Sequence, residues 1–310
     1  MLADCVLDIR ATLGESPIWH EGQQALYWID VGAPTINRFD PRTGANRAWL
    51  MPEPIGALAV ADDDRIVVAL KSGVQLFDIA TETFTFLVDP ELDRPANRLN
   101  DGRCDRRGRL WIGSMLDPVD PAQAPGTLNS VSGAAATRWV DGLVTSNGVA
   151  FSPDDRTLYH SDSFAGVRTI WRWDFDIDDG VITNRQVFVD TSGMAGRPDG
   201  ATVDTDGCYW SASNDGWAVL RYTPRGEVDQ VIRVPVRAPS MPCFGGSDLR
   251  TMYITSLRRP GADLRDQPLA GGIFAIDLPY QGLVEPRFTV DPATAAIGAI
   301  GAPGPSAPHR

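Results

Sequence analysis

The stretch that decides the fold is Ser146-Asn147-Gly148-Val149-Ala150-Phe151-Ser152-Pro153-Asp154-Asp155, followed by the run Leu158-Tyr159-His160. A turn rich in Asp, Gly or Asn, followed by a β-rich run, recurs five more times along the chain. The six runs begin at residues 26, 66, 110, 158, 208 and 252, at intervals of 40, 44, 48, 50 and 44 residues. Such a period, found before any single motif is interpreted, indicates a repeat architecture.

Each repeat has room for about four short strands. In the first repeat, Leu26-Tyr27-Trp28-Ile29 is followed by Ile36-Asn37-Arg38-Phe39, a turn at 40–44 and a further strand near 48–51. Repeats of this length and strand content are typical of propeller blades. No segment of ten or more residues has the apolar spacing of a helix. We therefore predict an all-β, six-bladed β-propeller; a two-sheet sandwich does not explain the even spacing.

One domain is expected to cover residues 1–290, and the Ala-, Gly- and Pro-rich residues 291–310 are expected to form a disordered tail. The extended stretch from Cys5 to Thr12 should pair with the last blade, since pairing there would cover an exposed strand edge.

Charge and composition exclude several classes of function. The chain has 40 acidic and 28 basic residues, a net charge of −12, so we expect neither nucleic-acid nor membrane binding. No apolar run approaches the roughly 20 residues of a membrane span, and the first residues carry no secretory signal. The four cysteines lack C-x-x-C spacing, which argues against a disulfide framework or thiolate metal site. We expect a cytoplasmic monomer or weak homo-oligomer.

The innermost strand of a blade precedes each marker run, and its start lies beside the central channel. Positions 8 to 11 residues before the markers are Glu15, Ile55-Gly56, Asn100-Asp101, Asn147, Asp199 and Phe244-Gly245. Four blades thus direct an acid or amide at one point. Each Asp-Gly or Asn-Gly pair alone is a common turn, but their shared phase predicts a common site.

Carboxylates buried together need a positive charge between them. Carboxylate and carboxamide oxygens suit a hard divalent cation such as Ca²⁺, Mg²⁺ or Mn²⁺, and Zn²⁺ and Fe²⁺ also accept oxygen ligands. The repeat therefore predicts one divalent metal ion at the propeller axis.

These residues make the chain similar to the senescence marker protein / gluconolactonase / luciferin-regenerating enzyme family of regucalcin-like propellers. The motifs are Gly14-Glu15-Ser16-Pro17-Ile18-Trp19, Asn97-Arg98-Leu99-Asn100-Asp101-Gly102, Ser146-Asn147-Gly148 and Arg197-Pro198-Asp199-Gly200. The resemblance implies a metal, Ca²⁺ or Zn²⁺ first, held by Glu15, Asn147 and Asp199, and sugar contacts from Arg98 and Asn100.

Two segments, 242–246 and 268–272, resemble the bacterial sugar-lactonase branch, which includes xylono- and arabinonolactonases. Animal relatives carry a sugar-gripping Glu shortly after a Gly-Thr-Met stretch, and here Gly113-Ser114-Met115-Leu116-Asp117 has none. Asp117 is the candidate replacement. Trp19 is a further candidate to line the pocket, and Trp217 a weaker one.

The resemblance implies a metal-dependent lactonase that opens an aldonolactone of the glucono-, xylono- or arabinono type. Its metal would polarise the ester carbonyl, and Arg98 and Asn100 would orient the sugar. Asp199 is the candidate general base, with a metal-bound hydroxide as the alternative. Two other functions stay open, a non-catalytic calcium-binding propeller and an organophosphate or phosphotriester hydrolase. A Ser-His-Asp hydrolase is disfavoured because G-x-S-x-G is absent, and His20 and His160 are expected to be packing residues.

Overall fold

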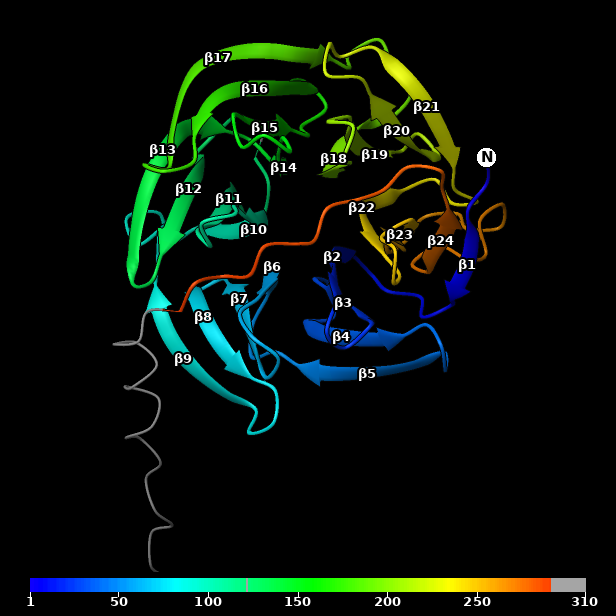
Figure 1. The fold of residues 1–310 in the computed structure, drawn as a ribbon, viewed down its shortest axis with the longest axis horizontal. Coiled ribbons are helices and arrows are strands. Elements are labelled where there is room, and N and C mark those ends of the chain that lie inside the picture. Colours follow the sequence, from blue (N-terminus) through cyan, green and yellow to red (C-terminus); the bar gives the residue numbers. More distant parts are fainter. Residues whose placement is uncertain (121, 291–310) are drawn as a thin grey trace, which may run out of the picture.

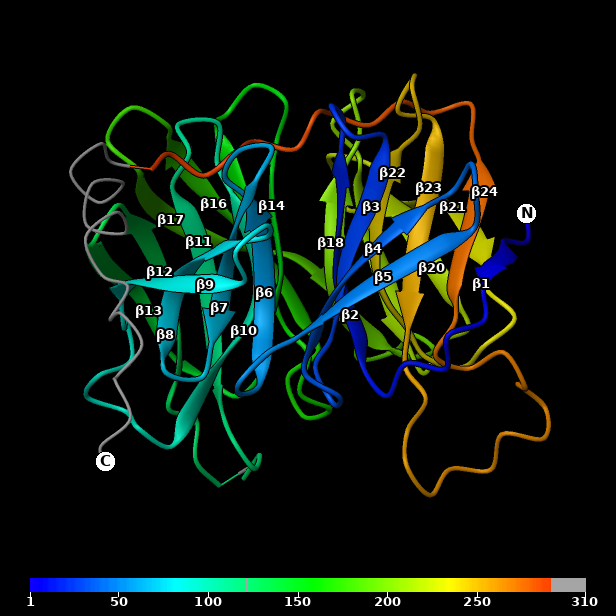
Figure 2. The same ribbon diagram turned by 90° about the horizontal axis from the view of Figure 1, so that it is seen from below.

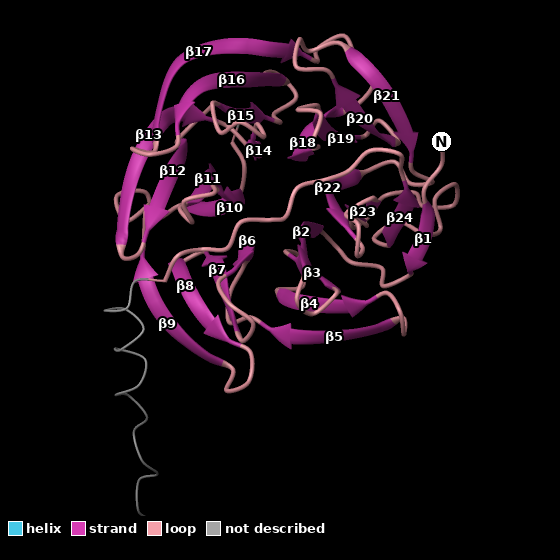
Figure 3. Cartoon of the chain, in the orientation of Figure 1, coloured by secondary structure: helices cyan, strands magenta, loops and turns pink. Residues whose placement is uncertain are grey.

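The computed structural model describes residues 1–120 and 122–290, and within them every regular element is a β-strand (Figure 3). The strands form six four-stranded antiparallel sheets arranged in a ring around an axis (Figure 1). This confirms the predicted all-β, six-bladed propeller. The tail predicted for residues 291–310 lies outside the described residues. Among the latter, no helix has the length and apolarity that crossing a bilayer requires.

Each blade runs outward from the axis in chain order, and its bounds are as follows. Blade one is β2 (Gly14–His20), β3 (Ala25–Asp30), β4 (Thr35–Asp40) and β5 (Ala45–Leu50); blade two is β6 (Ile55–Val60), β7 (Arg65–Leu70), β8 (Gly73–Asp78) and β9 (Thr83–Val88). Blade three is β10 (Asn97–Cys104), β11 (Leu110–Leu116), β12 (Gly126–Ser132) and β13 (Ala135–Leu143); blade four is β14 (Ser146–Phe151), β15 (Thr157–Asp162), β16 (Thr169–Asp176) and β17 (Val181–Asp190). Blade five is β18 (Arg197–Val203), β19 (Tyr209–Asn214), β20 (Ala218–Tyr222) and β21 (Val228–Arg233); blade six is β22 (Pro239–Gly245), β23 (Thr251–Ser256), β24 (Ile273–Asp277) and β1 (Asp4–Leu7).

The N-terminal strand closes the ring. Strand β1 pairs antiparallel with β24, with Cys5 opposite Phe274, and so supplies the outermost strand of blade six. The predicted pairing of the N-terminal stretch with the last blade is confirmed, although the strand ends at Leu7 rather than Thr12. Covering β24 in this way removes an exposed edge from the blade.

The core is divided among the blade interfaces. The described residues form six buried apolar clusters, one between each pair of adjacent blades. Trp28, Trp111 and Trp210 are among the largest fully buried side chains, and each lies on the second strand of its blade. The recurring aromatic in the marker run thus packs one blade against the next, and large apolar side chains buried in this way dominate the energetics of a core.

A repeated aspartate explains why the turn before the marker run recurs. The Asp105 carboxylate accepts hydrogen bonds from the backbone N–H of Arg107 and from Trp111 Nε1, the latter at 3.0 Å. Asp204 does the same in blade five, accepting from Asp206 N–H and from Trp210 Nε1 at 2.8 Å. One carboxylate therefore fixes both the turn and the aromatic that follows it, as short Asp side chains do in turns.

The last described residues cross the ring as a C-terminal strap (residues 278–290), orange to red in Figure 1. We call the face on which the innermost strands begin the start face; the strap lies on the opposite face (Figure 2). Backbone hydrogen bonds join the strap to four blades, including Thr205 N–H to Gln281 O, Gly282 N–H to Leu249 O and Phe288 N–H to Val60 O, each 2.8 Å long. Glu285 forms a buried ion pair with Arg103 at the end of β10. The strap thus closes the axial channel at that end.

Glu285→Ala is expected to lower the free energy of unfolding by about 3 kcal/mol, because it leaves the Arg103 guanidinium buried without its carboxylate. Chemical denaturation followed by tryptophan fluorescence measures this. Glu227→Ala is the matched control, since Glu227 and Arg225 form an exposed pair and such pairs contribute roughly 0–1 kcal/mol. Equal effects of the two substitutions on the free energy of unfolding would contradict a stabilising role of the Arg103–Glu285 ion pair.

Candidate active site

A cavity of about 320 Å³ opens on the start face, at the mouth of the axial channel. Its lining includes five of the seven sequence-predicted site residues, namely Glu15, Arg98, Asn100, Asn147 and Asp199. The remaining lining residues are Leu13, Met115, Val119, Thr145, Ser163, Phe164, Arg197, Asn214 and Leu257. The structure therefore brings together side chains from blades one, three, four and five that are up to 184 positions apart in the chain.

A shared backbone irregularity directs these side chains to the axis. In all six blades the pairing of the first two strands shifts close to the start of the first strand, at Glu15/Ile18, Ile55/Ala57, Asn100/Gly102, Asn147/Ala150, Pro198/Ala201 and Pro239/Pro242. Bulges of this kind re-aim side chains and concentrate near active sites. At Gly148 the φ is +66°, and a Cβ there would lie 2.4 Å from Tyr209 Oη, so only glycine fits behind Asn147.

Of the two acids of the site Asp199 is buried and Glu15 half-buried, and they are close enough for the charge of one to act on the other. Burial raises the pKa of Glu15 well above its usual value, and the neighbouring charges of Asp199 and Asp101 raise it further. Burial also raises the pKa of Asp199 to about 7, against the lowering effect of the hydrogen bond from Asn214. A bound cation would reverse both shifts, because it favours the charged carboxylates.

The amides of the site are held by hydrogen bonds that fix their orientation. Asn147 Nδ2 donates to Ser163 Oγ at 2.7 Å, which leaves Asn147 Oδ1 to accept from Asn100 Nδ2 at 3.1 Å. Asn100 Nδ2 also donates to Ser146 O at 2.7 Å, and Arg98 donates to Asn100 Oδ1 at 2.7 Å. The pair predicted to contact sugar is thus joined to the predicted metal ligand Asn147.

This donor set fits a hard divalent cation. Two buried carboxylates balance a 2+ charge, and carboxamide oxygens are further ligands that such ions accept. Within residues 1–120 and 122–290, no group of three or more His, Cys, Asp or Glu side chains could hold a metal. A cation at Glu15 and Asp199 would therefore rely on Asn147 and on oxygen atoms of water or substrate as well.

The raised pKa of Asp199 has a consequence for metal-free protein. Between about pH 4 and pH 7 the folded carboxyl keeps a proton that the unfolded chain releases, so its stabilising contribution declines as pH rises through this range. In EDTA at pH 8, the melting temperature of wild type is expected to be lower than that of Asp199→Asn. The difference between the two melting temperatures should disappear by pH 5. Scanning calorimetry at both pH values checks this, and a pH-independent gap would contradict it.

Asp101 is a third axial carboxylate, to which the sequence assigned no role of its own. Only 5% of it is exposed, its φ is +45°, and its Oδ1 has no hydrogen-bond partner among the described residues. Burial raises its pKa, and its charge raises that of both Glu15 and Asp199. The bulge after Asn100 turns Asp101 into the channel, and strand alternation alone could not have shown this.

Three sequence expectations are corrected by the structure. Trp19 does not line the cavity: it is 5% exposed, stacks on Tyr253 at 5.5 Å between ring centroids, and belongs to the core between blades six and one. Trp217 lies in a separate groove with Arg237. Phe244-Gly245 lies at the far end of β22, and the strand register makes Pro239 the blade-six equivalent of Glu15. The irregular spacing within that repeat produced the error in register.

Asp117 lies close to the cavity without lining it. It does not line the cavity, although Met115 and Val119 beside it do. Its charge favours the protonated form of Arg98, whose pKa is lowered overall by burial. Its proximity to Arg98 makes it a neighbour of the predicted sugar-binding pair. His160 is fully buried and meets Ser146 Oγ at 2.8 Å, and burial lowers its pKa to about 3, which agrees with a packing role.

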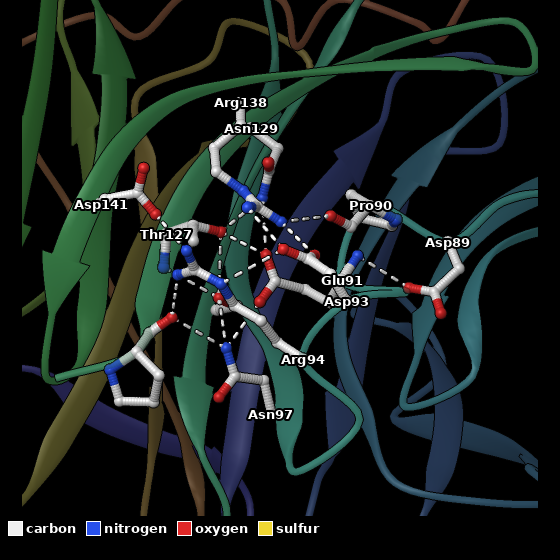
Figure 4. Close-up of polar contacts among 12 residues, drawn as sticks. Asp89, Pro90, Glu91, Asp93, Arg94, Asn97, Thr127, Asn129, Arg138 and Asp141 are labelled. Carbon is white, nitrogen blue, oxygen red and sulfur yellow. Dashed lines mark hydrogen bonds and ion pairs between the residues drawn. The ribbon is translucent and has the colours of Figure 1, made fainter. Parts of the chain in front are cut away.

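Behind Arg98 a buried carboxylate organises the start of β10 (Figure 4). Glu91 is 5% exposed and accepts hydrogen bonds from Asn97 Nδ2 at 2.6 Å, from Asn129 Nδ2 at 3.2 Å and from Thr127 Oγ1. Asn97 also donates to Pro125 O at 3.0 Å. The cluster therefore ties the residue preceding Arg98 to the end of the 117–125 loop that carries Val119 to the cavity.

Glu91→Ala is expected to lower the free energy of unfolding by about 2–4 kcal/mol, because it leaves buried amide donors unpaired. We also expect a rise in KM, since Arg98 loses the support of Asn97. Chemical denaturation and steady-state kinetics measure the two effects. The control is Glu82→Ala, which removes an exposed acid in the turn between β8 and β9 of blade two. An unchanged KM in Glu91→Ala would contradict the positioning role.

Comparison with known proteins agrees with this geometry. Residues 13–258 match the family described as SMP-30/Gluconolactonase/LRE-like region. The 6-deoxy-6-sulfogluconolactonase of Pseudomonas putida is 40% identical, over 92% of this chain and 97% of its own. The L-arabinolactonase of Azospirillum brasilense is 32% identical, over 94% and 96%. A crystal structure of regucalcin from Agrobacterium tumefaciens, described as a calcium-binding protein, has a TM-score of 0.88 at 28% identity, covering 93% of this chain and 97% of its own. Together with the shared propeller and the family's motif residues converging at the axis, these matches show that the chain belongs to the SMP-30/gluconolactonase/LRE family.

Proposed function

We propose that this protein is a metal-dependent sugar lactonase, which hydrolyses an aldonolactone of the glucono-, xylono- or arabinono type to the aldonic acid. The observation that carries the proposal is that Glu15, Asn147 and Asp199 line one cavity together with Arg98 and Asn100. Relatives that match almost the whole chain carry the names of sugar lactonases, which supports this chemistry.

The chemistry of ester opening assigns a role to each group of the site. A divalent cation held by Glu15, Asn147 and Asp199 would supply Lewis-acid polarisation of the ester carbonyl. Arg98 would donate hydrogen bonds to ring hydroxyls, and Asn100 Oδ1 would accept one from a ring hydroxyl, which together would hold the ester in place. Asp199, fixed by Asn214 Nδ2 at 2.5 Å, would orient a water and take its proton as a general base.

The alternative is a propeller that binds calcium without catalysis. It is favoured by the description of the Agrobacterium regucalcin as a calcium-binding protein. It predicts metal binding with no hydrolysis. A phosphotriester hydrolase would instead cleave paraoxon or a fluorophosphate, and no sugar-binding pair is needed for that reaction.

A pH-indicator assay tests the proposal. Glucono-, xylono-, arabinono- and galactonolactone are each supplied to purified protein, with EDTA or with added Ca²⁺, Zn²⁺, Mn²⁺ or Mg²⁺. We expect acid release well above the spontaneous rate from at least one lactone, dependent on metal. Acid release from none of them would end the proposal, and paraoxon hydrolysis in the same assay would favour the phosphotriesterase.

A further inference from the structure

The lining residues of the cavity form two tiers. Glu15, Asn100, Asn147 and Asp199 form the lower tier, and all four line the cavity. The residue two positions earlier on each chain segment also lines it, giving an upper tier of Leu13, Arg98, Thr145 and Arg197. In β10 both Arg98 and Asn100 precede the bulge, so they point to the same side and lie about 6.6 Å apart along the strand; in β18 Arg197 precedes the bulge that contains Asp199. The upper tier thus precedes the metal ligands along each chain segment, where the part of a substrate farthest from them would lie.

The upper tier contains two arginines that are not equivalent. Arg98 lies near the Asp117 carboxylate and donates to Asn100 Oδ1. Arg197 is half-buried and, in the part of the chain that the structure describes, forms no ion pair or side-chain hydrogen bond. Its charge acts on Asp199 and Asp215, because it lowers the pKa of both carboxyls.

Neither Asp199 nor Asp215 is available to neutralise the charge of Arg197. Asp215 is shared by Arg237 Nε at 3.0 Å and Arg259 Nη1 at 2.6 Å. Asp199 belongs to the metal-binding set of the proposed function. Among the described residues Arg197 therefore has no carboxylate partner outside the metal set. Its positive charge is in excess at this side of the cavity, in a chain whose overall charge is −12.

A neutral sugar does not require such an excess. A half-buried guanidinium with free donors binds oxyanions in a charge-assisted, often bidentate manner. With the ester carbonyl at the lower tier, the far substituent of the sugar would reach the upper tier at blade five. We propose, on the basis of the lactonase function above, that the substrate is a sugar lactone bearing an oxyanion, such as a phosphate or sulfonate, on its terminal carbon, and that Arg197 binds this group.

Paired substrates test this assignment. The kcat/KM of the metal-loaded wild type is measured for D-glucono-1,5-lactone, its 6-phosphate and its 6-sulfonate, with the spontaneous rate subtracted. We expect a preference of at least about tenfold for one of the anionic lactones, shrinking as NaCl is raised because salt screens charge. The two anionic arms identify whether phosphate or sulfonate is the better fit.

Arg197→Gln should remove the preference through a rise in KM of about 10- to 100-fold for the anionic lactone, a loss larger than the loss of kcat/KM for the neutral lactone. Arg197→Lys should keep part of the preference for the anionic lactone, because lysine retains the positive charge but lacks the planar guanidinium that can donate two parallel hydrogen bonds. Arg265→Gln is the matched control, since this surface arginine is 90% exposed and pairs with Asp263.

Two results would overturn the inference: a wild type that does not prefer an anionic lactone, or an Arg197→Gln variant that loses neutral and anionic activity equally. The second would mean that Arg197 acts on Asp199 rather than on the substrate. If no lactone were hydrolysed, the proposed function would fail, and calorimetric titration with 6-phosphogluconate and gluconate would judge the anion site alone. Tighter binding of 6-phosphogluconate than of gluconate, lost in Arg197→Gln, would support the anion site. Equal binding of the two compounds would reject the anion site.

Discussion

Asp199→Ala is expected to abolish turnover, with a loss of kcat of at least about 1,000-fold. The reason is that one carboxylate serves two purposes. It would be one of the two acids that hold the cation, and its hydrogen bond from Asn214 fixes its orientation in the cavity, where it would act as the base. Metal affinity is expected to fall by more than about 100-fold, since even residues behind the ligands change it by 10- to 100-fold. Calorimetric titration with Ca²⁺ and Zn²⁺ and steady-state kinetics measure the two losses.

Two variants make this result interpretable. Asp190→Ala removes an exposed aspartate at the end of β17 and should leave both kinetics and metal binding unchanged. Asn100→Ala should mainly weaken substrate binding, raising KM by about tenfold, with a smaller effect on metal because Asn100 also orients Asn147. Near-normal lactonase activity in a correctly folded Asp199→Ala protein would refute both the metal set and the base.

Removal of the metal is the second change with a large expected effect. Dialysis against EDTA should reduce lactone hydrolysis by more than about 100-fold and lower the melting temperature, because Glu15 and Asp199 are then left buried beside Asp101 without a compensating charge. Re-addition of single metals should restore both properties together, and the ion that restores them at the lowest concentration identifies the native metal.

Glu15→Gln provides an internal check on this experiment. The change keeps the shape of the side chain and removes one of the three mutually repelling charges. The variant should therefore be more stable than wild type in EDTA and gain less on addition of metal. Full activity of EDTA-treated wild type, after residual metal has been shown to be absent by elemental analysis, would disprove metal dependence.

Much of the fold could be predicted from the sequence because a propeller repeats a local pattern. The turn aspartates and the aromatics that follow them, such as Asp105 with Trp111 and Asp204 with Trp210, act within one blade. Their period gave the number of blades, and the phase of Glu15, Asn147 and Asp199 within that period gave their meeting at the axis. The family motifs then pointed to a sugar lactone.

What the sequence could not supply depends on contacts between repeats. Trp19 belongs to an apolar cluster between blades six and one, and no local pattern distinguishes a tryptophan there from one in a pocket. Asp101 faces the channel because a bulge changes the alternation of β10. Among the described residues Arg197 has no ion-pair partner, and Arg237 and Arg259, from the loops before β22 and after β23, both pair with Asp215.

The sequence by itself determined the all-β repeat, the count of six blades and the set of acids and amides at the axis, since each follows from residue types at a regular spacing. Only the tertiary structure decided the two tiers of the cavity, the third axial carboxylate, the strap that closes the channel and the uneven sharing of charge around Asp215. The physical reason is that burial and electrostatic pairing are properties of neighbours in space, and the propeller brings together neighbours that the chain keeps far apart.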